Sequence, residues 1–137
     1  MIFAHRLAAA LLGVAAVASA SGAEFHIGAH NFTLPDGFTI EKVTTPELVE
    51  RPVSASFDDQ GRLYVTDSSG SNEKPAQQLL HPTPRIRRLE DTNADGTFDR
   101  SVVFADKLAF PEGCLWHEGS VYVAVPPSIL RFTDTHG

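Results

Sequence analysis

Apolar and polar residues alternate in short runs along most of the chain from residue 38 onward. Clusters of Gly, Pro and Asp separate these runs. Beyond the N-terminal region, no window of ten residues keeps the apolar spacing of a helix. The pattern therefore predicts short β-strands joined by turns. The predicted strands are Phe38–Val43, Val53–Phe57, Leu63–Thr66, Ile86–Leu89, Val102–Phe104, Leu115–Trp116, Val121–Val125 and Ile129–Phe132.

These strands recur in the same order with related sequences. Pro52–Tyr64 (PVSASFDDQGRLY) resembles Pro111–Tyr122 (PEGCLWHEGSVY), and a valine follows each segment. Pro84–Thr92 (PRIRRLEDT) matches Pro127–Thr135 (PSILRFTDT) at five of nine positions, 43 residues apart. The first copy carries about 15 additional residues after Asp67. A period of about 43 residues is the length of a four-stranded propeller blade.

The repeat predicts an all-β fold, namely a partial β-propeller with about two four-stranded blades. Within the first blade, we expect the strands to lie in sequence order from the innermost to the outermost, namely Pro52–Phe57, Leu63–Asp67, Arg85–Glu90 and Phe98–Phe104. Phe38–Val43 would then be the outer strand of a last blade that closes the ring. A single blade cannot cover both of its faces, so we expect this chain to be the first part of a larger ring. The alternative is a small free-standing β-sandwich.

The N-terminus has the pattern of an export signal. A basic start, Met1–Arg6, precedes an apolar run of eleven residues, Leu7–Val17, and the small residues Ala18-Ser19-Ala20. The run is shorter than the ~20 residues that span a bilayer. We therefore predict a signal helix over residues 1–20, an N-terminal segment over 21–37 and propeller blades over 38–137. The mature protein would be periplasmic or extracellular without a transmembrane helix; the alternative is an uncleaved anchor.

Charge and cysteine content exclude several classes of function. The chain has 11 basic and 17 acidic residues, a net charge of −6, which disfavours binding to nucleic acid phosphates. The single Cys114 excludes an internal disulfide, a thiolate zinc site and a CxxCH haem attachment within these residues.

One segment has the composition of a cation-binding loop. Oxygen-bearing side chains alternate around a glycine in the pattern D-x-N-x-D-G-x-x-D, and such oxygens favour calcium. The predicted metal ligands are Asp91, Asn93, Asp95, Thr97 and Asp99. The twelfth position is Val102, where an EF-hand needs glutamate, so we expect modest affinity at most. An ordinary polar hairpin turn explains the same residues, and both interpretations stay open.

For the other residues with chemically active side chains, the pattern favours structural roles. We expect Arg85 and Arg87 to share one strand face, with Arg88 on the other, each paired with acidic neighbours. His117 is expected in a solvated turn. The remaining candidates are Cys114 and Trp116, predicted to be buried, and the segments Asp67–Gly70 and Glu112, predicted to share the loop end where propeller ligands usually bind.

The segments Arg51–Asp67, Arg85–Asp99 and Phe110–Pro126 carry a resemblance to a known family. The phrase FPEGCLWHEGSVYVAVP, with the following D-T-x-G loop, resembles the N-terminal propeller of exported "membrane-bound dehydrogenase" proteins of planctomycetes and their relatives. These are also described as PVC-type haem-binding CxxCH proteins. They are distantly similar to glucose and sorbosone dehydrogenases that use pyrroloquinoline quinone (PQQ).

The resemblance implies a six-bladed ring, PQQ and haem c in the full-length protein, and the remaining blades as partners of this chain. It implies oxidation of a sugar, alcohol or aldehyde. No position in residues 1–137 matches the family's catalytic or quinone-binding motifs, so we assign no catalytic or cofactor-binding residue and expect this chain alone to be inactive. The alternatives are a non-catalytic propeller that binds glycans or proteins, and a calcium-dependent lactonase-like hydrolase.

Overall fold

The computed structural model describes residues 22–68, 70 and 72–135. The chain divides into two compact units at the bond between Glu41 and Lys42. The signal peptide predicted over residues 1–20 lies outside the described residues. Within the described part, no helix is both long and apolar enough to cross a membrane.

The N-terminal unit contains a β-hairpin that the sequence pattern did not predict. Strand β1 (Ala23–Ile27) pairs antiparallel with β2 (His30–Leu34), so that Phe25 lies opposite Phe32. Gly28 has a φ of 59°, which a glycine adopts without steric cost at a tight turn. The Nδ1 atom of His26 lies 2.6 Å from Oδ1 of Asn31 and links the two strands across the turn.

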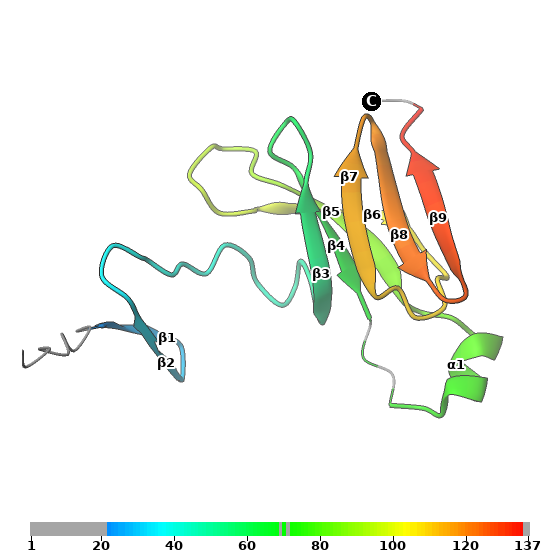
Figure 1. Cartoon of the computed structure of the whole chain (residues 1–137), viewed down its shortest axis with the longest axis horizontal. Coiled ribbons are helices and arrows are strands. Elements are labelled where there is room, and N and C mark those ends of the chain that lie inside the picture. The colour runs from blue at the N-terminus through cyan, green and yellow to red at the C-terminus, as the bar shows by residue number, and fades with distance from the viewer. Residues whose placement is uncertain (1–21, 69, 71, 136–137) are drawn as a thin grey trace, which may run out of the picture. The chain divides into compact units, whose positions relative to one another are not determined.

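The C-terminal unit begins with a complete four-stranded antiparallel sheet (Figure 1). Its strands are β3 (Pro52–Phe57), β4 (Leu63–Asp67), β5 (Arg85–Glu90) and β6 (Arg100–Ala105). They are hydrogen-bonded in the order β3-β4-β5-β6, which confirms the strand order predicted from the sequence.

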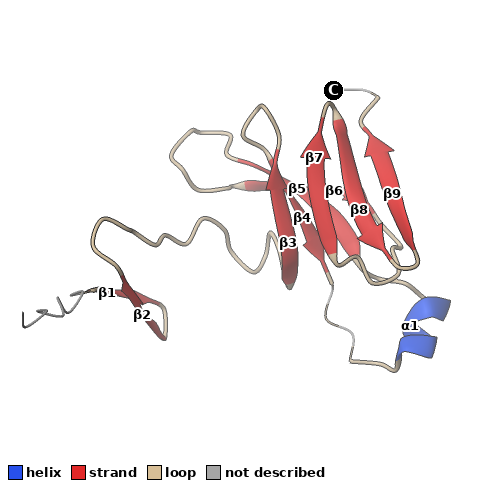
Figure 2. Cartoon of the chain, viewed as in Figure 1, coloured by secondary structure: helices blue, strands red, loops and turns tan. Residues whose placement is uncertain are grey.

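A second antiparallel sheet follows, with the same connectivity. It contains β7 (Gly113–His117), β8 (Ser120–Val125) and β9 (Ser128–Thr133), in the order β7-β8-β9. Only one helix, α1 (Pro75–Leu80), occurs among the described residues, and it lies in the segment that the first copy has in addition (Figure 2). The fold is therefore all-β, as predicted.

The prediction of a strand at Phe38–Val43 is wrong. The described backbone there is irregular, although it has an alternating pattern. The carbonyl oxygen of Val43 instead accepts a hydrogen bond from the N–H of Phe98 (2.9 Å), and its side chain packs against the apolar cluster that contains Leu89. These contacts hold Val43 against the first sheet without forming a ladder.

The two sheets of the C-terminal unit pack against each other with β3 and β7 side by side (Figure 1). Tyr64 and Ile86 of the first sheet form one apolar core with Val121 and Val123 of the second. The ring of Tyr64 meets that of Phe104 edge to face, with centroids 5.0 Å apart. Trp116, which was predicted to be buried, is only partly buried at the margin of this core.

A second, smaller core covers the opposite face of the first sheet. It consists of Val65, Leu89 and Phe98 from the sheet region, and Leu48 and Val49 from the segment that precedes β3. The sheet is therefore buried on both faces along β4, where Tyr64, Val65 and Thr66 are each 2% exposed or less.

Two sheet faces remain partly open in this chain. Phe57, the repeat counterpart of Trp116, is 62% exposed. Its ring lies beside that of Phe98, with 6.4 Å between the ring centroids. On the outer face of the second sheet, Leu115 is 59% and Ile129 is 76% exposed. Apolar residues that alternate along a strand are thus buried only where a second sheet or segment covers them.

Candidate functional site

A buried carboxylate organises the end of the first sheet at which β4 finishes. The side chain of Asp67 has no exposed surface. Its Oδ2 atom accepts a hydrogen bond from Nε of Arg87 (2.8 Å) and lies 3.4 Å from Nε of Arg85. Its Oδ1 atom accepts the backbone N–H of Arg51 (2.9 Å). Close cations and hydrogen bonds of this kind offset the cost of removing a carboxylate from water.

The strand register brings these groups together. Asp67 pairs with Arg85 in the β4–β5 ladder, and Arg87 lies on the same face, two residues further on. Arg88 faces the other way and pairs with Glu90 (2.9 Å) and with Asp134 (3.1 Å). The prediction that the arginines pair with acidic residues from opposite faces of one strand is confirmed.

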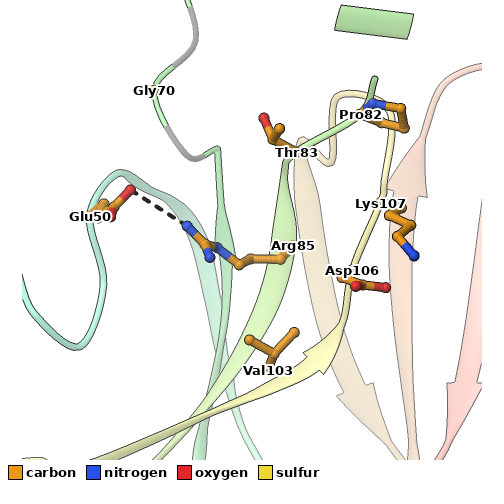
Figure 3. Close-up of a pocket in the computed structure, with 8 residues that line it drawn as sticks. All are labelled: Glu50, Gly70, Pro82, Thr83, Arg85, Val103, Asp106 and Lys107. Carbon is orange, nitrogen blue, oxygen red and sulfur yellow. Dashed lines mark ion pairs between the residues drawn. The ribbon is translucent and has the colours of Figure 1, made fainter. Parts of the chain in front are cut away.

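A pocket of about 580 Å³ opens beside Arg85. Figure 3 shows the carboxylate of Glu50 directed toward Arg85. Its Oε2 atom lies 3.5 Å from Nη2 of Arg85. Lys107 and Asp106 reach the pocket from the segment after β6, and Thr83 from the segment before β5. Cationic and anionic groups therefore alternate around one opening, an arrangement suited to a neutral, polar ligand.

A second pocket, of about 210 Å³, lies where β3 and β7 begin. Its walls are both apolar and polar, and they come from the start of β3, helix α1, the residue before β5 and the segment before β7. The lining residues are Val53, Ser68, Gln78, Pro84, Phe110, Pro111 and Glu112. The prediction that the segment after Asp67 and the segment containing Glu112 meet at one end is confirmed for Ser68 and Glu112.

Sequence reasoning did not single out Phe110, Gln78, Glu50 or Lys107. Phe110 has a φ of 52°, a conformation rarely adopted by a bulky residue. Its place before Pro111 was the only signal available, because proline restricts the residue that precedes it. The contributions of Gln78 and Lys107 depend on long-range chain packing, which local patterns do not specify.

The predicted calcium ligands lie in the hairpin between β5 and β6. The carboxylate of Asp91 accepts the N–H groups of Asp95 (3.2 Å) and Gly96 (2.8 Å). Asp99 accepts the N–H (3.1 Å) and the hydroxyl (2.7 Å) of Thr92. These hydrogen bonds, the hydroxyl foremost, lower the pKa of Asp99.

Asn93 and Asp95 are also engaged within the hairpin. Asn93 Nδ2 donates to Asp95 Oδ2 (3.0 Å), and Asp95 Oδ1 accepts the N–H of Thr97 (2.8 Å). Over the described ranges, no three His, Cys, Asp or Glu side chains come together in a way that could hold a metal ion. The structure shows the hydrogen bonding of a polar turn, and calcium binding stays a prediction.

The surroundings of His117 and Cys114, the residues of the second sheet with reactive side chains, indicate structural roles. The His117 side chain is 64% exposed beside a turn in which Glu118 and Gly119 both have positive φ, which confirms a solvated turn histidine. Burial raises the pKa of the Cys114 thiol, whose Sγ atom lies 3.4 Å from the carbonyl oxygen of Tyr64. A thiol with a raised pKa is a poor nucleophile at neutral pH.

The geometry thus defines an all-β protein with two repeated sheets. Two pockets open at the end of the sheets where β4 finishes and β7 begins. Residues 26–137 match a family described as a domain of unknown function (DUF7133), and the chain belongs to this family. No curated protein and no solved structure matches the chain.

Proposed function

We propose that this chain supplies the first blade and most of the second blade of an exported, six-bladed β-propeller whose complete ring oxidises a sugar, alcohol or aldehyde. The chain serves as scaffold and as one wall of the substrate site. We assign it no catalytic residue. Its partners are the remaining blades of the same ring.

One observation carries the propeller proposal. Two successive copies of a repeated sequence fold into separate sheets of the same connectivity, and these pack face to face with inner strands β3 and β7 adjacent. A free-standing sandwich of two such sheets would carry mainly polar side chains on its outer faces. Here Phe57 and Ile129 are 62% and 76% exposed on opposite sides of the pair. Sheets that continue around a ring account for both.

The two pockets support a polar organic substrate. Both open at the end where β4 finishes and where β3 and β7 begin, the end at which propellers place ligands. The smaller pocket combines the apolar walls Val53, Phe110 and Pro111 with the polar side chains Gln78 and Glu112. Apolar walls with a few convergent polar groups are the usual composition of small-molecule sites.

The residues present do not fit the redox groups that the family resemblance implies. A covalently attached haem c needs a CxxCH sequence, and the chain has a single cysteine. The quinone is a polyanion, whereas Glu50 and Asp106 line the larger pocket beside Arg85 and Lys107. We therefore assign neither group to residues of this chain, and both would be held by other parts of the ring.

The function is tested with the protein as encoded by its gene. Purified protein is incubated with PQQ and calcium, and reduction of an electron-accepting dye is followed with aldoses, alcohols and aldehydes. We expect substrate-dependent dye reduction by the encoded protein and none by residues 1–137 alone. Release of acid from a lactone without dye reduction would instead favour the hydrolase. Saturable glycan binding without turnover would favour the non-catalytic propeller.

Calcium binding by the 91–99 hairpin is proposed as a structural function and is tested separately. Calcium is titrated into the metal-free chain while the melting temperature is recorded. If Asp91 and Asp95 bind the ion, Asp95→Ala removes the calcium-dependent rise in melting temperature. Asp59→Ala, at an exposed turn elsewhere, serves as the matched control and leaves the rise intact. No rise in the unmodified chain would establish the hairpin as a metal-free turn.

A further inference from the structure

One ion pair ties the two sheets together at the edge of their shared core. Arg88 extends from β5 of the first sheet, and its Nη1 atom lies 3.1 Å from Oδ2 of Asp134, just beyond β9 of the second sheet. Both side chains are at least three-quarters buried, with exposed fractions of 16% and 24%. Desolvation of this degree strengthens the attraction between the two charges, so the loss of either partner is more costly than in an exposed pair.

Arg88 and two core residues of the first sheet have counterparts in the second copy of the repeat, 43 positions later in the third strand and 58 positions later in the second strand. Ile86 corresponds to Ile129, and Arg88 to Arg131. Tyr64 corresponds to Tyr122 in the matching second strand. In the first sheet, these three residue types point toward the second sheet: Ile86 and Tyr64 are 0% and 1% exposed in the shared core, and Arg88 reaches Asp134.

In the second sheet, the corresponding residues share the outer face. Tyr122 pairs with Leu115 on one side and with Arg131 on the other, and Ala124 pairs with Ile129. Ile129 is 76% exposed, although its counterpart Ile86 is fully buried. Leu115, Tyr122, Ala124 and Ile129 also line a hollow of about 320 Å³. We call Leu115, Tyr122, Ala124, Ile129 and Arg131 the interlock surface.

We propose that the interlock surface docks a further sheet of the same repeat within the same polypeptide, and that Arg131 pairs with an aspartate that follows the third strand of that sheet. This inference rests on the proposed propeller and adds the residues that position each sheet against the next one. Arg131 is a positioning residue with no part in the chemistry.

Two observations select this occupant over an unrelated partner. The matching face of the first sheet already holds a sheet of this kind, so the surface would make the equivalent contact one repeat further along the chain. The surface also places a cation beside apolar residues at the position where Arg88 meets Asp134. An apolar strand followed by a carboxylate is complementary to it in shape and in charge.

The occupant is identified by cross-linking in the protein as encoded. A photoreactive phenylalanine analogue replaces Ile129, and the captured peptide is sequenced by mass spectrometry. The same analogue at Leu80, which is 67% exposed on α1, is the matched control. We expect an intramolecular product at position 129 whose partner peptide belongs to a strand with alternating apolar residues, in a sheet with an aspartate after its third strand. The control does not give this product.

The ion pair is then tested by exchanging charges. Arg131→Asp lowers the melting temperature, and so does replacement of the identified aspartate by arginine. The double variant recovers at least half of the loss if the two groups face each other. A cross-link to a second copy of the protein, a captured peptide of another pattern, no product at position 129, or no recovery in the double variant would each overturn the proposal.

These outcomes are independent of turnover. A protein that reduces dye but shows no recovery retains its proposed function and loses the Arg131 pairing. A protein that shows the cross-link and the recovery without dye reduction retains the interlock surface and loses the proposed oxidation.

Discussion

Ile86 and Ile129 offer a matched pair of substitutions, because the same side chain occupies equivalent repeat positions in opposite surroundings. Ile86 is fully buried between the two sheets, and Ile129 is 76% exposed. Replacing Ile86 by alanine removes buried methyl and methylene groups and leaves a cavity against Val121 and Val123. Such changes lower the free energy of unfolding by about 2–5 kcal/mol. Ile129→Ala, at an exposed position, is expected to change it by less than about 0.5 kcal/mol.

The measurement is urea unfolding of the 137-residue chain, followed by the fluorescence of Trp116, the one tryptophan. Trp116 packs against the same core and reports its opening. Sucrose is present in all samples, because excluded solutes strengthen apolar burial and give a marginal chain a measurable baseline. Equal losses for the two variants would refute the packing of the sheets described here. A large loss for Ile129→Ala alone would reverse the assignment of the buried face.

Three further outcomes follow from individual side chains. Asp67→Asn removes the buried carboxylate that two partly buried guanidinium groups share and should lower the free energy of unfolding by about 3–5 kcal/mol in urea titrations, whereas Asp59→Asn at an exposed turn should have little effect. The raised pKa of Cys114 predicts slow alkylation by iodoacetamide at pH 8 in the folded chain and fast alkylation in urea; equal rates would contradict its burial. Because hydrogen bonds lower the pKa of Asp99, the stabilisation they give is complete above the ordinary carboxyl pKa and is lost as the pH falls through the lowered value. Thr92→Val should raise the pKa of Asp99, measured by carboxyl-carbon NMR, and an unchanged value would show that the hydroxyl does not act on it.

The first sheet and most of the second could be predicted from the sequence because their strands are short apolar-rich runs that end at strong turn residues. The repeat also indicated their order, because Pro84–Thr92 and Pro127–Thr135 are identical at five of nine positions. The hairpin at residues 23–34 was missed although its strands alternate, with Phe25 opposite Phe32 on one face and Glu24 opposite Thr33 on the other. None of its residues is fully buried. Helix α1 was missed because six residues are too few to show a helical period, and Lys74 provides no side-chain cap.

The candidate site was predicted less completely than the fold. The parity of strand residues predicted that Arg85 and Arg87 share a face, but only the register of β4 against β5 identifies Asp67 as their common partner. The pocket residues Gln78 and Phe110 are 32 positions apart in the sequence and meet through the fold. Phe57 shows the opposite limit. Phe57 alternates with polar residues along β3, which predicts burial. It is nevertheless 62% exposed, because the described residues cover only part of its ring.

The boundary between the two sheets depends on a pair of hydroxyl groups. Strand β7 runs beside β3, yet its amides at Cys114 and Trp116 donate to the side-chain oxygens of Ser54 (3.3 Å) and Ser56 (2.9 Å) rather than to backbone carbonyls. Side-chain acceptors hold the neighbouring strand at a distance and an angle that a backbone ladder would not allow. The two serines thereby mark the boundary between the sheets, and the seven strands form two sheets and not one.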